Sequence, residues 1–76
     1  MQPVAYSMTI DEQAEFITQV QQSLRTAQNK LDRKALEAGA GMIDSAAFMA
    51  LPEKVQEDIL AQYAGAMVRV TGAFTP

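Results

Sequence analysis

The sequence predicts an all-α fold, and more specifically an elongated antiparallel helical hairpin. Three observations predict it: a long helical pattern at residues 9–38, a glycine-rich connection after it, and a second helical pattern at residues 52–71. A short helical turn is expected between them, at residues 45–51. A chain of 76 residues forms one small domain. We expect residues 1–8 to be an extended arm and residues 73–76 a tail.

The first predicted helix contains no Gly or Pro between Thr9 and Ala38. Thr9 and Glu12 have the spacing of a capping box, which marks a helix start. A helix of about 29 residues is roughly 43 Å long, whereas a compact domain of this chain length is about 30 Å across. We therefore expect an elongated molecule. The apolar residues recur at intervals of three and four, as on one helix face: Ile10, Ile17, Val20, Leu24, Ala27, Leu31, Ala35 and Ala38.

The connection and the second helix are marked by turn residues. Gly39-Ala40-Gly41 is expected to end the first helix, with one glycine in the left-handed conformation. Asp44 or Ser45 is a candidate N-cap for the short turn, and Gly72 is a candidate C-cap for the second helix. The β-branched segment 67–71 also suits a strand, and this alternative stays open.

A short connection favours antiparallel neighbours. The two helices then pair at positions whose numbers sum to about 82. This register places Phe16 and Ile17 beside Gly65 and Ala66, where a large side chain meets small ones.

The second helix carries more apolar surface than the first helix can cover. Its main apolar row faces the first helix, and a second row of Met49, Leu60 and Met67 lies beside it. Two interpretations stay open: the second row is core closed by the chain's own tails, or it is an interaction surface. Methionine suits an interaction surface because its side chain adapts its shape. The candidate interaction residues are Met49, Leu60, Met67, Phe74 and Tyr6.

Composition and charge weigh against most other classes of function. The chain has no Cys and no His, so thiolate metal sites and the commonest general base are absent. Its carboxylates cluster at the predicted helix starts, where they are favoured anyway. The net charge of −3 with mixed signs argues against a nucleic-acid binder. We expect no catalytic residues, cofactor, metal or small-molecule substrate.

No apolar run approaches the length of a membrane span, and no secretory signal pattern opens the chain. We therefore expect no membrane association, and a location in the cytoplasm or within a virus particle.

Residues 51–60, LPEKVQEDIL, resemble the opening of an F-box and of several small antitoxin helices. The plan of a small helical hairpin is also similar to that of secretion-needle subunits. The first likeness covers a common helix start, and the chain lacks the Pro-bounded turn and the long C-terminal helix of needle subunits. We transfer no function from either.

The sequence therefore favours a non-catalytic protein that works by binding protein. We expect a small subunit or accessory factor of a larger bacterial or phage assembly, which binds a partner protein or copies of itself. The alternative is a regulatory binder, such as a phage-encoded inhibitor or an antitoxin, that blocks a host protein.

Overall fold

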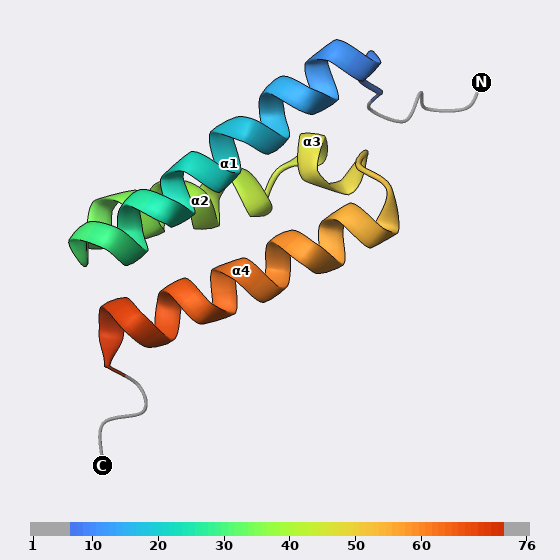
Figure 1. Ribbon diagram of the computed structural model, residues 1–76. Coiled ribbons are helices and arrows are strands. Elements are labelled where there is room, and N and C mark those ends of the chain that lie inside the picture. Colours follow the sequence, from blue (N-terminus) through green and yellow to red (C-terminus); the bar gives the residue numbers. More distant parts are fainter. Residues whose placement is uncertain (1–6, 73–76) are drawn as a thin grey trace.

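The computed structural model describes residues 7–72, which form four helices (Figure 1). These are α1 (Ile10–Lys30), α2 (Arg33–Ile43), α3 (Ala46–Met49) and α4 (Glu53–Thr71). The all-α prediction is confirmed. Residues 67–71 are helical, so the strand alternative is wrong. Most of the predicted arm, and the tail at residues 73–76, lie outside the described residues.

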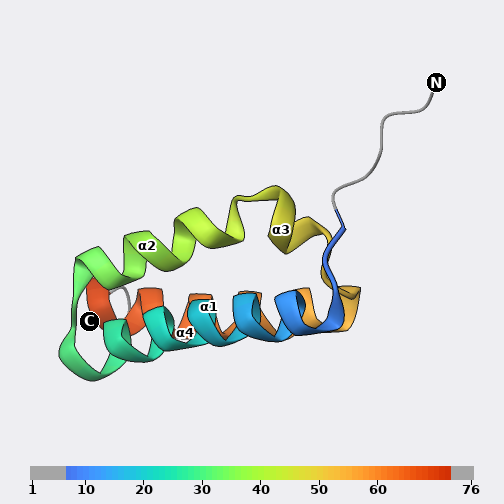
Figure 2. The ribbon, with the colours of Figure 1, turned by 90° about the horizontal axis from the view of Figure 1, so that it is seen from above.

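Three long helices pack together, where the sequence predicted two. Figure 1 shows α1 and α4 running in the same direction. The helix α2, which follows α1 in the chain, runs in the opposite direction. Seen from above, α2 lies beside the pair formed by α1 and α4 (Figure 2). Each of the three helices contacts the other two. The cross-section of the bundle is 21 × 20 Å, and α1, its longest helix, is roughly 31 Å long.

The prediction of one unbroken helix at residues 9–38 is wrong, because the chain reverses at Leu31 and Asp32. Leu31 adopts the left-handed conformation with φ 51° and ψ 45°. The Asp32 N–H donates to the Ala27 carbonyl at 3.1 Å, which is the long bond of a Schellman motif. The Asp32 carboxylate then caps α2 by accepting from the N–H groups of Lys34 and Ala35, at 2.9 and 3.2 Å.

The predicted helix end at Gly39 to Gly41 is also wrong, because α2 continues through both glycines to Ile43. Gly39 is buried and faces α1. A Cβ at this position would lie 2.7 Å from Leu24 Cδ2, closer than real contacts allow. Gly39 therefore lets two helices approach closely, and it does not end one of them.

The helix starts and ends that the sequence marks elsewhere are confirmed. Thr9 and Glu12 form the predicted capping box, with N···O distances of 2.8 and 3.1 Å. Ser45 caps α3 by accepting from the Phe48 N–H at 3.3 Å. Gly72, with φ 67°, ends α4.

The predicted register of the two long helices is wrong, because α1 and α4 are parallel. The Arg69 Nε donates to the Gln28 carbonyl oxygen at 3.1 Å. A Cβ on Gly65 would lie 3.9 Å from Nε2 of the same glutamine. Gly65 thus lies beside the end of α1, where the antiparallel pairing placed it beside Phe16 and Ile17. The physical reason is the break at Leu31, since α2 takes the antiparallel place next to α1.

A small apolar core holds the bundle together. It draws on every helix, and each member is at most 8% exposed. The core consists of Val20, Leu24, Ala27, Leu36, Phe48, Leu51, Ile59 and Ala66. Three other members of the predicted apolar stripe, Ile10, Leu31 and Ala38, are exposed. The break at Leu31 explains why a stripe drawn through residues 9–38 does not describe one buried face.

Candidate interaction surface

The candidate residues Leu60 and Met67 lie on the flank of α4 that is turned away from α1. Ile59 is fully buried and marks the core-facing side of α4. At 100° per residue, Arg69 lies on one side of this direction and contacts Gln28 of α1. Leu60 and Met67 lie on the opposite side. Because α2 also contacts α4, this second flank adjoins α2.

Met49 ends α3 and is brought to the start of α4 by a side-chain bridge. The amide Nε2 of Gln56 donates to the carbonyl oxygens of Met49 and Leu51, at 3.2 and 2.9 Å. Gln56 lies one helical turn before Leu60, on the same part of the α4 surface. We use the name α3–α4 surface for Met49, Leu60 and Met67.

The three side chains of the α3–α4 surface differ in how far they are covered. Met49 is 71% exposed, Leu60 46% and Met67 39%. More than half of Leu60 and Met67 therefore already packs against the protein itself. The remaining surface of each side chain is apolar and exposed. The two interpretations that the sequence left open, core closed by the tails or interaction surface, stay predictions. Tyr6 and Phe74 lie outside the described residues, and their inclusion stays a prediction.

Acidic residues border the α3–α4 surface at the start of α4. Glu53 and Glu57 precede Leu60 by seven and three positions, which places them on neighbouring parts of the helix surface. The nearby Lys54 makes a 3.5 Å ion pair with Asp58, and both side chains are largely exposed. A surface ion pair of this kind contributes little to stability. The α3–α4 surface thus presents apolar side chains with carboxylates beside them.

The charged residues separate along the bundle, which the sequence alone does not reveal because it depends on the direction of each helix. The starts of α1 and α4 lie together beside α3, and α2 ends part-way along the bundle toward them; we call this half of the bundle the acidic end (right in Figure 1). It holds Asp11, Glu12, Glu15, Asp44, Glu53, Glu57 and Asp58, with Lys54 as the one cation.

The opposite end, where α1 and α4 finish and α2 starts, is called the basic end (left in Figure 1). It holds Arg25, Lys30, Arg33, Lys34 and Arg69, with the carboxylates of Asp32 and Glu37. Seven carboxylates and one cation give −6 at the acidic end, and five cations and two carboxylates give +3 at the basic end; together these make the net charge of −3.

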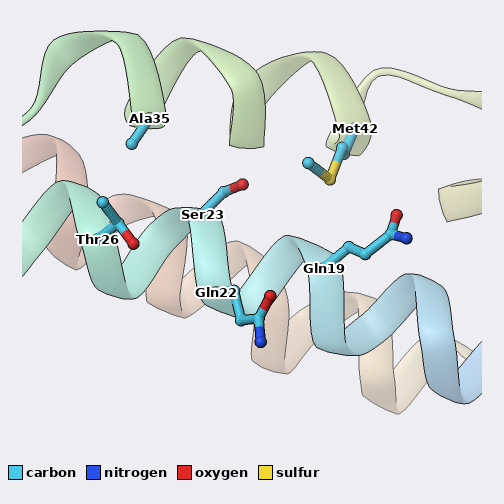
Figure 3. Close-up of a pocket in the computed structure, with 6 residues that line it drawn as sticks. All are labelled: Gln19, Gln22, Ser23, Thr26, Ala35 and Met42. Carbon is cyan, nitrogen blue, oxygen red and sulfur yellow. The ribbon is translucent and has the colours of Figure 1, made fainter.

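A shallow groove between α1 and α2 has a different character (Figure 3). Its volume is about 380 Å³. One wall presents amides and hydroxyls from α1, and Met42 of α2 points toward the gap (Figure 3). The lining residues are Gln19, Gln22, Ser23, Thr26, Ala35 and Met42. They carry no formal charge, so the groove offers hydrogen bonds and apolar contact but no ion pair.

Two smaller depressions flank α1. One, of about 270 Å³, is lined by Met8, Glu12, Glu15, Phe16, Gln19 and Ala47. The other, of about 230 Å³, lies between α1 and α4 and is lined by Gln21, Leu24, Arg25, Gln28 and Gln62. Neither includes a residue of the α3–α4 surface. Within residues 7–72, no group of three His, Cys, Asp or Glu residues is placed to hold a metal ion.

No protein-family model, curated protein or solved structure matches the chain. None of the four helices in the described part of the chain is both long and apolar enough to cross a bilayer.

Proposed function

We propose that this protein is a non-catalytic protein–protein interaction protein, a small subunit or accessory factor of a larger bacterial or phage assembly. The observation that carries the proposal is the α3–α4 surface. Its three large apolar side chains are exposed on two elements, α3 and α4, that are joined by the hydrogen bond from Gln56 to the Met49 carbonyl. Contiguous apolar surface on a small protein commonly marks a binding site. Two of the three residues are methionines, which adapt to the shape of a partner.

The size of this surface limits how much affinity it supplies. Complete burial of an exposed Leu or Met side chain contributes about 1.5–3 kcal/mol. Because Leu60 and Met67 are already more than half covered, the three residues together contribute about 3 kcal/mol. Micromolar binding requires about 8 kcal/mol. The α3–α4 surface is therefore the apolar centre of a larger contact that also includes polar and charged neighbours.

The proposal is tested by retention of partners on the immobilised chain. We compare the wild type with Leu60→Asp, and use Leu31→Asp as the matched control because it adds the same charge at another exposed leucine. We expect one protein from a lysate of the source cells to be retained in stoichiometric amount by the wild type and the control. Leu60→Asp should lose it, with helicity by circular dichroism unchanged.

Retention of the same proteins by all three chains would show that the α3–α4 surface is not the binding site. If none of the chains retains a partner and the wild type does not self-associate either, the proposed function is wrong.

A further inference from the structure

The charge separation along the bundle is only partly explained by helix dipoles. Carboxylates stabilise helix starts, which accounts for the acidic first turns of α1 and α4. The start of α2 is different. It begins with Arg33 and Lys34 and has no acidic residue in its first turn. Lys30 and Arg69 lie in the last turns of α1 and α4, where the helix dipoles favour cations. Arg33 and Lys34 oppose the dipole at the start of α2, although the Asp32 carboxylate caps it, so helix dipoles leave these two cations unexplained.

Two copies of a molecule with oppositely charged ends attract each other when they lie antiparallel. The acidic end of each copy then meets the basic end of the other, and both contacts are attractive. In a parallel pair, like ends meet and repel. Charge complementarity of this kind selects the orientation of a complex and raises its rate of formation.

The α3–α4 surface lies where such a pair would touch. Leu60 is near the middle of α4 and Met67 lies about one turn before its end, both on the flank that adjoins α2. Glu53 and Glu57 border them toward the acidic end, and the start of α2 lies on the same side toward the basic end. Consider a two-fold axis that is perpendicular to α4 and passes between Leu60 and Met67. It places Glu53 and Glu57 of each copy near the start of α2, with Arg33 and Lys34, in the other copy.

We infer that the partner of the α3–α4 surface is a second copy of this chain, laid antiparallel along the first. This inference rests on the proposed function, since it assigns an occupant to the same surface. The contact is isologous: each copy contributes the same residues, and the pair closes on itself.

The dimensions of the bundle favour this side-by-side pair over an end-to-end chain, which the charges alone would also allow. The cross-section is 21 × 20 Å. That is about half of the roughly 800 Å² that each partner buries in a stable interface. A side-by-side contact extends along α4, which is about 28 Å long, and it covers the exposed apolar residues as well.

The test is the mass of the protein in solution, measured by sedimentation equilibrium over a range of concentrations and salt. At low salt we expect the mass to rise with concentration from 8.3 kDa to twice that value and to stop there. Salt near 0.5 M should weaken the pair, because screening shortens the range of charge–charge attraction to a few ångströms.

Two charge-reversal variants sharpen the test. Arg33→Glu with Lys34→Glu makes both ends acidic, and it suits the helix dipole, so α2 should remain folded. Glu53→Lys with Glu57→Lys reverses the border of the α3–α4 surface. Each variant alone should be monomeric at low salt, and an equimolar mixture of the two should pair.

Gln19→Glu with Gln22→Glu serves as the control, since it adds negative charge in the groove between α1 and α2. This variant should pair like the wild type. Leu60→Asp should remain monomeric with unchanged helicity.

Several results would overturn the inference. A wild type that stays at 8.3 kDa up to about 1 mM at low salt has no such pair. In that case the proposed function is judged separately, by retention of a different partner. A mass that continues beyond two copies indicates end-to-end chains. The inference is also contradicted if the mixture of the two charge-reversal variants pairs no better than each variant alone. The same holds if the Leu60→Asp variant still pairs.

Discussion

Gly39 and Gly41 are two positions apart in α2, yet their surroundings are opposite. Gly39 is buried against Leu24, whereas a Cβ on Gly41 would meet nothing within 4 Å. We expect Gly41→Ala to stabilise the protein by up to about 1 kcal/mol, because Ala is the better helix former. Gly39→Ala gains the same propensity but forces Leu24 to move in a packed core, which costs about 1–3 kcal/mol.

Urea unfolding of the two alanine variants checks this prediction. The difference between their free energies of unfolding isolates the packing cost at Gly39, because the propensity term is common to both. Equal shifts in the two variants would mean that Leu24 adapts without cost and that α1 and α2 are less tightly packed than the structure shows.

Leu31 adopts the left-handed backbone conformation, which is sterically unfavourable for a residue with a side chain. It is the one non-glycine residue among residues 7–72 with positive φ, and its side chain is 59% exposed. Since glycine adopts this conformation without steric cost, we expect Leu31→Gly to raise the free energy of unfolding by about 1 kcal/mol. Leu31→Ala removes the same apolar surface but keeps the strain, so it should not stabilise. A stabilising alanine would assign the effect to the exposed side chain.

The break at Leu31 also shows what residue patterns cannot predict. Leu31 continues the spacing of three and four from Leu24 and Ala27, and no Gly or Pro marks a turn. The available signal was Asp32, a good N-cap residue that is followed by a new apolar period. An Asp residue alone is weak evidence for a helix start when the apolar spacing on both sides of it continues without interruption. Tertiary packing of α2 on α1 decides the conformation.

At the scale of elements, Asp32 does the most to start α2. Its carboxylate accepts two backbone N–H groups, and no other acidic residue lies in the first turn of α2. We expect Asp32→Ala to destabilise the protein by about 1 kcal/mol, the usual cost of losing an N-cap. Thermal unfolding followed by circular dichroism provides the measurement.

Asp32→Asn is the matched variant, because an amide oxygen accepts the same hydrogen bonds without the charge. It should retain most of the stability. If both variants lose equally, the carboxylate acts mainly through its charge beside Arg33 and Lys34, and the cap hydrogen bonds matter less.

Three element boundaries that depend on local chemistry were predictable. The capping box of Thr9, the Ser45 cap and the glycine at 72 each satisfy backbone groups within a few residues, and the structure shows all three. The prediction of a helix end at Gly39 to Gly41 was wrong because glycine allows a helix to end but does not require it. Packing contacts can stabilise a helix that continues through a glycine. Here the close packing of Gly39 against Leu24 stabilises α2 beyond this position.

At the scale of the whole molecule, the direction of α4 relative to α1 decides the charge distribution. In the predicted hairpin the two acidic helix starts lie at opposite ends, and the charges largely balance along the molecule. In the structure α1 and α4 are parallel, so both acidic starts fall at one end. The candidate residues Met49, Leu60 and Met67 could be named from the sequence. Their charged border could not, because it depends on this long-range arrangement.

The reversal at Leu31 and Asp32, held by one strained residue and one cap, is also a hinge. If the hinge opens, α1 and α2 join into a single helix, the form that the apolar spacing alone predicts. Leu24 of one chain then packs against Gly39 of another chain, and the two molecules exchange α1 across the unit formed by α2, α3 and α4. We expect Asp32→Ala to promote this domain-swapped dimer and Leu31→Gly to suppress it. Unlike a pair held by charge, the exchanged dimer should persist in high salt and separate slowly on dilution, as gel filtration would show.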